Sequence, residues 1–196
     1  MSSFAEYYRG FEKMEVFMLN DLKNATIHGH ANFLVAMALF NYFEILGAFY
    51  FPCDLKEKES RRFNFVFTDL LSNKYKNVFE KIRDRIAKPY NVLRCGMTHG
   101  YLPIILVENN QNINVAYAIK GVDSLAQYDQ CINDIECGIE LKQQNKNECV
   151  ITVYNPRLIY DFQAAFRELK NRINSDDDYK AKFVMRASDI NLDRLV

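Results

Sequence analysis

FLVAMALFNYFEILGAFYF, residues 33–51, is the most hydrophobic run of the chain, and Pro52 closes it. Its length approaches that of a membrane-spanning helix, which needs about 20 apolar residues. Asn41 and Glu44 interrupt the run, however, and a carboxylate exposed to lipid at such a depth costs ~2.5–3.5 kcal/mol on insertion scales. We therefore predict a central helix that is buried on nearly all sides, and no membrane span.

Glu44 on this helix needs a partner, because an unpaired buried carboxylate costs several kcal/mol or stays protonated. Two alternatives follow from the sequence. In the first, Glu44 pairs with Arg94 from the other apolar segment that carries polar residues. In the second, it reaches water at a helix end or pairs with another arginine.

The segments on either side of this run predict an α+β fold. Apolar side chains recur at helical spacing over residues 4–22, and shorter helices follow over 63–71 and 75–82. A charged loop, residues 53–62, separates the first of these from the central run. Beyond residue 103 the pattern alternates and predicts two β-hairpins, over 104–119 and 135–154, with a helix between them. Asn155 and Pro156 mark the start of another helix as N-cap and first residue, and Asp176 to Asp178 cap a last short one.

These segments group into two parts. Residues 1–102 form a helical bundle, and residues 103–196 form a small antiparallel sheet with a C-terminal helix that packs back on the bundle. We expect the two parts to pack as one domain, which suits a length of 196 residues.

Composition excludes some classes of function. Lys+Arg and Asp+Glu both number 25, so the chain lacks the basic excess of proteins that bind nucleic acid by bulk phosphate neutralisation. Five cysteines without a C-x-x-C pair, and a start without a basic region leading into an apolar run, indicate free thiols and a cytoplasmic protein. We expect no metal and no cofactor, because the chain has neither paired Cys/His motifs nor a glycine-rich phosphate loop.

The second informative stretch is YNVLRCGMTHGY, residues 90–101. Pro89 suits the first position of a helix. At about 100° per residue, one helical face carries Asn91, Arg94, Cys95, Thr98 and His99, and the other carries small and apolar residues that pack. An ordinary solvent face would carry Lys and Glu, and this face has neither, so the segment is a candidate site.

Arg94 and His99 fit the pattern R-x4-H, and the longer string LRCGMTHGY resembles L-R-x-G-x-x-H-x-Y segments of bacterial proteins. The arrangement resembles the HEPN superfamily. This resemblance implies an all-α bundle core for residues 4–102 and, in active members, metal-independent endoribonuclease activity in defence or toxin–antitoxin systems. It also implies a homodimer in which two copies of the motif meet. Arg94 and His99 carry over as catalytic residues, whereas Cys95 stands where the family commonly has a polar residue.

The chemistry of RNA cleavage suits these two residue types. Attack by a 2′-hydroxyl needs proton transfer near neutral pH, which histidine provides. The phosphorane accumulates negative charge, which arginine holds through parallel hydrogen bonds. Further substrate contacts are expected from Asn91 on a base, from Thr98 and Tyr101 on the phosphate, and from Arg83 and Arg85 of the basic run at 81–88. The alternative for that run is an ordinary solvated helix face.

A different class of function fits the same residues. In a non-catalytic module that dimerises or binds a protein partner, Arg94 is the internal counter-ion of Glu44 and His99 is a core histidine near a helix end. Gly96 and Gly100 then serve to let a neighbouring helix approach closely. A third arrangement, a Cys95–His99 nucleophile pair at i, i+4, lacks an accompanying oxyanion-hole signature.

Overall fold

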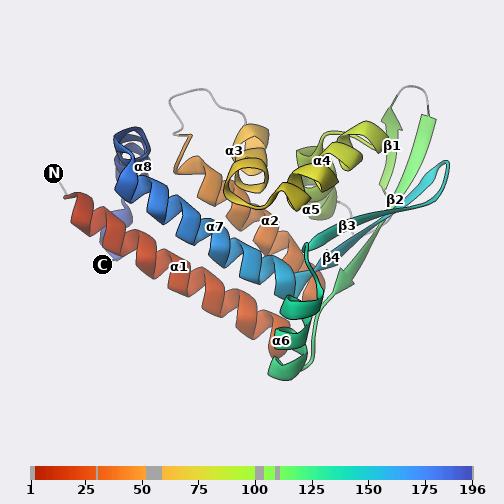
Figure 1. Cartoon of the computed structure of the whole chain (residues 1–196), viewed down its shortest axis with the longest axis horizontal. Coiled ribbons are helices and arrows are strands. Elements are labelled where there is room, and N and C mark those ends of the chain that lie inside the picture. Colours follow the sequence, from red (N-terminus) through yellow and green to blue (C-terminus); the bar gives the residue numbers. More distant parts are fainter. Residues whose placement is uncertain (1–2, 30, 52–58, 100–103, 109–110, 196) are drawn as a thin grey trace.

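The structure, a computed structural model, describes residues 3–29, 31–51, 59–99, 104–108 and 111–195 (Figure 1). Three long helices form its centre: α1 (Phe4–Ile27), α2 (Asn32–Ala48) and α7 (Asn155–Ser175). Helix α8 (Asp177–Asp189) and the 3-10 helix η4 (Leu192–Leu195) pack against α1. Among the described helices, none combines the length and the apolar character that a membrane span requires.

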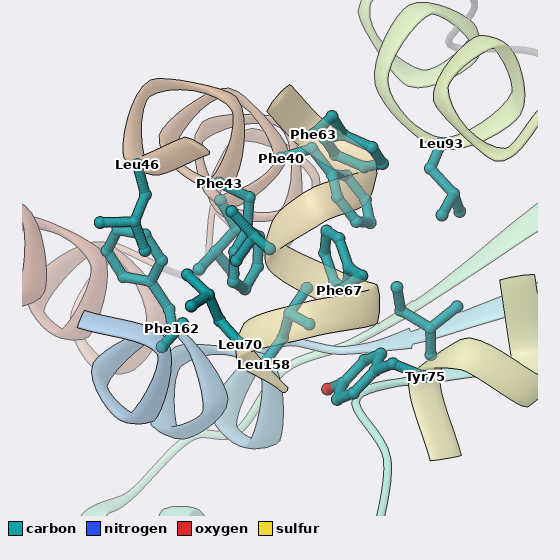
Figure 2. Close-up of a cluster of buried hydrophobic side chains, with 14 of the residues drawn as sticks. Phe40, Phe43, Leu46, Phe63, Phe67, Leu70, Tyr75, Leu93, Leu158 and Phe162 are labelled. Carbon is teal, nitrogen blue, oxygen red and sulfur yellow. The ribbon is translucent and has the colours of Figure 1, made fainter. Parts of the chain in front are cut away.

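The central apolar run forms α2, as predicted, although the helix ends at Ala48 and not at Phe51. Phe40, Phe43 and Leu46 are at most 1% exposed and pack into a cluster of buried hydrophobic side chains (Figure 2). The N–H groups of Tyr50 and Phe51 both bond to the carbonyl of Gly47, at 3.2 Å, in the turn that follows the helix. Gly47 also allows α2 to approach the next helix, because a Cβ there would lie 2.1 Å from the Arg62 carbonyl oxygen.

Helix α1 is longer than the predicted 4–22. Ser3 and Glu6 form a capping box at its start, which fixes the first turn. It continues to Ile27 because Thr26, which is fully buried, donates its hydroxyl hydrogen to the Leu22 carbonyl and fits inside the helix. A polar residue in this position can occupy a helix when its own hydrogen bond is made to the preceding turn.

The chain then forms α3 (Glu59–Phe65), the π-helix η2 (Val66–Leu70) and α4 (Asn73–Arg85). The predicted charged loop at 53–62 is wrong from Glu59 onward, where α3 has already begun; residues 52–58 lie outside the described residues. The helices predicted over 63–71 and 75–82 are confirmed. In η2 the Leu71 N–H bonds to the Val66 carbonyl, five residues back, so this turn is wider than an α-helical one.

The sheet lies at one end of the bundle (Figure 1). Its strands are β1 (Ile104–Glu108), β2 (Gln111–Lys120), β3 (Ile139–Asn145) and β4 (Glu148–Tyr154), in the order β1-β2-β4-β3. Both predicted hairpins are confirmed, and α6 (Leu125–Asp134) lies between them. The prediction of an antiparallel sheet is wrong at the centre, where β2 and β4 pair in parallel. Because α6 and β3 separate β2 from β4 in the chain, the connection is long enough for a parallel crossover.

Asn155 does not cap α7 as predicted. Tyr154 precedes the helix, and the Asn155 amide nitrogen instead donates to the Asn32 carbonyl at the start of α2, at 2.8 Å. Pro156 does lie in the first turn of α7, and Asp176 caps α8 through the N–H groups of Asp178 and Tyr179. The sequence pattern thus located these helix ends but not the tertiary contact that Asn155 makes.

A buried polar cluster ties α4 to α7. The Tyr75 hydroxyl donates to Asp161 at 2.5 Å and accepts the Gly138 N–H at 2.8 Å. Arg157 holds the same carboxylate through two nitrogens, at 3.0 and 2.9 Å. Burial raises the pKa of the Asp161 carboxyl, while the hydrogen bonds from Arg157 and Tyr75 oppose that shift. The cluster therefore stabilises one arrangement of α4, α7 and the start of β3.

The buried side chains of both predicted parts of the chain form one hydrophobic core, in which Phe162 of α7 lies beside Phe43 of α2. The α+β class with a helical core is thus confirmed. Besides the differences in helix ends and caps given above, the structure differs from the sequence prediction in the pairing inside the sheet and in its π-helical turns.

Candidate functional site

The R-x4-H segment forms the π-helix η3 (Tyr90–Cys95) and the short helix α5 (Gly96–His99). It begins as predicted at Pro89, because the Val92 N–H bonds to the Lys88 carbonyl. The Gly96 N–H bonds to the Asn91 carbonyl five residues back, so the turn is wider than the 3.6-residue helix assumed from the sequence. Side-chain directions in this turn therefore differ from those of the predicted 100° wheel.

The apolar face of the segment packs as predicted. Val92, Leu93 and Met97 are all 0% exposed. Figure 2 shows Leu93 pointing from this segment towards the buried cluster around Phe63 and Phe67. Packing on that side fixes the segment against α2 and α3.

Arg94 pairs with Glu44, which resolves the alternative left open by the sequence. The Arg94 Nε atom donates to Glu44 Oε2 at 3.0 Å, and the two side chains retain 22% and 18% of their exposure. The pair is thus neither fully buried nor a surface pair. Charges at such a boundary interact more strongly than in bulk water while still meeting solvent.

Tyr90 completes this contact. Its hydroxyl donates to the same Glu44 oxygen at 3.4 Å, and its ring packs edge-on against Phe63 of α3, with the centroids 5.7 Å apart. Partial burial raises the pKa of Tyr90 to about 12, and the negative charge of Glu44 adds to that shift. Tyr90 therefore remains protonated, and a donor to Glu44, throughout the neutral pH range.

A second tyrosine, which belongs to the sheet, makes a hydrogen bond to the π-helix η3. The Tyr117 hydroxyl, on β2, donates to the Val92 carbonyl at 2.6 Å, and burial raises the pKa of this hydroxyl. Tyr90 and Tyr117 were both missed as site residues by sequence reasoning. The only signal in the sequence was that Tyr117 falls on the inward side of an alternating strand.

The remaining predicted site residues fall into two groups. Asn91 is exposed and Cys95 is a half-buried free thiol on the same segment as Arg94. The backbone of Thr98 and His99 belongs to α5, but their side chains, and all of Tyr101, lie outside the described residues. The structure therefore places Arg94 and His99 on one helical segment and brings Glu44 to the first of them.

Arg83 and Arg85 lie in the last turn of α4, and Arg85 makes a hydrogen bond to the sheet. The Arg85 Nη2 atom donates to the Lys146 carbonyl in the turn between β3 and β4, at 2.7 Å, whereas Arg83 is exposed. This contact gives Arg85 a structural role that the sequence did not indicate.

In the described part of the chain, no group of three or more His, Cys, Asp or Glu side chains is placed to hold a metal ion.

We compared the chain with protein families, with curated proteins and with solved structures. No protein-family model, no curated protein and no solved structure matches the chain.

Proposed function

We propose that the protein is a HEPN-like, metal-independent endoribonuclease of a defence or toxin–antitoxin system, in which Arg94 and His99 act on the scissile phosphate. The observation that carries the proposal is the Glu44–Arg94 pair. It holds an arginine of the R-x4-H motif on a helical segment at the boundary of the core, with 22% of the side chain exposed. A guanidinium that is already held in position stabilises a charged transition state without a further loss of conformational entropy to orient it.

In the proposed reaction the 2′-hydroxyl oxygen attacks the adjacent phosphorus, a cyclic phosphate forms, and the 5′-oxygen leaves with a proton. His99 transfers protons to or from the reacting oxygens, and Arg94 stabilises the negative charge of the phosphorane. Asn91 is exposed beside Arg94 and suits a contact with a base. We assign Thr98 and Tyr101 to the phosphate on the basis of their place in the motif.

A homodimer belongs to the same proposal. One chain offers one acid–base residue in this segment, whereas the reaction needs a proton removed from one oxygen and another delivered to a second. Two motifs that face each other across a two-fold axis supply both groups, and such an interface uses the same patch on both subunits.

The test is cleavage of single-stranded and structured RNA by the purified protein in the presence of a metal chelator. We expect Arg94→Ala and His99→Ala each to reduce the rate at least ~100-fold, the scale of removing a charge-stabilising group or an acid–base group. Lys170→Ala is the matched control, because Lys170 is also 22% exposed and also paired, with Glu15 at 2.7 Å. It removes a comparable ion pair outside the motif and is expected to leave the rate unchanged.

Two results would overturn the assignment. One is the absence of cleavage with every RNA tested, at high protein concentration and with the dimer confirmed by light scattering. The other is activity that persists in both motif variants, which would trace it to a contaminant.

The Glu44–Arg94 contact also favours a second candidate, a non-catalytic module that dimerises or binds a protein. Here the pair neutralises two charges inside the bundle, and the motif segment serves as a packing surface. This candidate predicts a stable dimer without RNA cleavage. In that case Arg94→Ala lowers the stability of the protein and changes no catalytic rate.

A further inference from the structure

The π-turn of η3 coincides with a hydrogen bond that reaches it from the sheet. At the start of η3 the spacing is still α-helical, since the Val92 N–H bonds to the Lys88 carbonyl, four residues back, at 3.1 Å. At the end, the Gly96 N–H bonds to the Asn91 carbonyl, five residues back. An α-helix would place the Gly96 N–H on the Val92 carbonyl instead. The Val92 carbonyl that this wide turn passes over is the one to which Tyr117 of β2 donates, at 2.6 Å.

A hydrogen bond of this kind widens a helical turn. Helices depart from regular geometry where a side chain inserts into the ladder of i→i−4 hydrogen bonds. The carbonyls of that ladder point along the helix axis, whereas the Tyr117 hydroxyl comes from a strand outside the helical segment. A carbonyl that is drawn away from the axis lengthens its own bond in the ladder. The Gly96 N–H is then better satisfied by the preceding carbonyl, that of Asn91.

The sheet holds the Tyr117 hydroxyl in place as a donor. The Tyr117 side chain is half-buried, and burial raises the pKa of its hydroxyl, which therefore stays protonated at neutral pH. The backbone of Tyr117 is fixed by the parallel pairing of β2 with β4, in which it lies opposite Ile151. A donor that the sheet already orders loses little conformational entropy when it makes this bond.

The packing of the core is a second candidate cause of the π-turn. Val92 and Met97 are both 0% exposed and lie five residues apart. In an α-helix, residues five apart point in directions that differ by about 140°, whereas five-residue hydrogen bonds bring them towards the same side. The substitution Tyr117→Phe separates the two causes, because it keeps the aromatic ring and removes only the hydroxyl.

The width of the turn also affects the R-x4-H motif. One extra residue in a turn rotates the chain that follows by up to about 100° around the helix axis. Helix α5 follows η3 directly and ends at His99, while Arg94 lies within η3 and is held by Glu44. The π-turn thus sets the rotation of the α5 backbone relative to the part of the segment that Glu44 holds.

We propose that Tyr117 is a positioning residue of the R-x4-H segment. Its hydroxyl holds the π-turn of η3, and this turn sets the angle around the helix axis between Arg94 and the backbone of His99. The consequence for catalysis rests on the proposed function, whereas the control of the π-turn by Tyr117 does not.

The first measurement is the NMR coupling across the hydrogen bond between the Gly96 amide nitrogen and its acceptor carbonyl carbon, in the full chain. In the wild type this coupling joins Gly96 to Asn91. In Tyr117→Phe we expect it to weaken at least about twofold and a coupling from Gly96 to Val92 to appear, because the loss of one hydrogen bond shifts such an equilibrium by a factor of about 2–10.

Two controls accompany this measurement. Tyr154→Phe removes the hydroxyl of another half-buried strand tyrosine, which donates to Glu140 at 3.2 Å, and is expected to leave the Gly96 acceptor unchanged. The Leu71 N–H of η2 also bonds five residues back, to the Val66 carbonyl. Its coupling should persist in both variants and shows that the rest of the fold is intact.

The second measurement is the rate of RNA cleavage. We expect Tyr117→Phe to lower kcat at least about tenfold with KM unchanged, since small displacements of catalytic groups are costly, and Tyr154→Phe to change neither. A wild type that cleaves no RNA refutes the proposed function, and the NMR coupling then still decides whether Tyr117 holds the π-turn. A Gly96–Asn91 coupling of full strength in Tyr117→Phe overturns the inference and assigns the π-turn to core packing alone. A changed acceptor with wild-type kcat overturns the positioning role.

Discussion

The Glu44–Arg94 pair allows a quantitative prediction through a double-mutant cycle of Glu44→Gln and Arg94→Gln. Exposed ion pairs contribute ~0–1 kcal/mol, whereas removing one partner of a fully buried pair costs ~3–5 kcal/mol. Side-chain exposures of 22% and 18% place this pair between those limits. We therefore expect a coupling free energy of about 1–2 kcal/mol. The double variant should lose that much less stability than the sum of the losses measured in the two single variants.

The free energy of unfolding of the four proteins is measured by urea denaturation at pH 7, followed by far-UV circular dichroism. A parallel cycle on Asp178 and Lys182 is the control, because that pair is formed at 2.6 Å while its carboxylate side chain is 63% exposed. Its coupling is expected near 0.3–0.5 kcal/mol, the usual value for an i, i+4 helix pair. If the Glu44–Arg94 coupling does not exceed that of the control pair, the argument from partial burial is refuted.

Three further outcomes are expected. Tyr75→Phe removes one of the donors to the buried Asp161 and the acceptor of the Gly138 N–H, and should cost ~1–3 kcal/mol in the same urea assay; a loss under ~0.5 kcal/mol would contradict the buried cluster. The folded state holds the Tyr90 proton more tightly than the unfolded chain does, so its stabilising contribution is present below pH 10 and disappears as the pH rises towards about 12. The difference in phenolate absorbance between wild type and Tyr90→Phe should therefore have its midpoint near pH 12, and a midpoint at pH 10 would argue against the partial burial of Tyr90 and its proximity to Glu44, which together raise the pKa. Arg85→Ala should speed amide hydrogen exchange in the turn between β3 and β4, while Arg83→Ala, which removes an exposed neighbour, leaves it unchanged; equal effects would assign the protection to charge alone.

Local patterns in the sequence were sufficient for most of the secondary structure. Apolar spacing located α1, α2 and α4, and alternation located both hairpins, because these signals depend on neighbours in the chain. The buried carboxylate of Glu44 called for a partner, and Arg94 was one of few arginines in an apolar segment. This energetic demand therefore made the Glu44–Arg94 contact one of the two alternatives that the sequence left open, and the structure shows that it is formed.

What could not be predicted depends on partners distant in the chain. The parallel pairing of β2 with β4 follows from how both hairpins pack on the helices, and neither hairpin carries a local signal for it. The π-turns change the angle between successive side chains, so a wheel drawn at 100° per residue misdirects the side chains around Arg94. Asn155 has a typical capping residue type, yet it bonds to Asn32 because α2 begins beside it in space.

The parallel pairing of β2 and β4 also governs the order of events during synthesis on the ribosome. When residue 120 has been made, β1 and β2 can form a hairpin, but the other edge of β2 has no partner until residues 148–154 have followed. α7, which covers α2 in the finished core, is made later still. A nascent chain therefore exposes both an unpaired strand edge and the apolar face of α2 while residues 121–154, about a sixth of the protein, are synthesised, which favours aggregation. Arrest of translation in this interval, with measurement of chaperone binding to the stalled chain, would reveal how the cell handles that exposure.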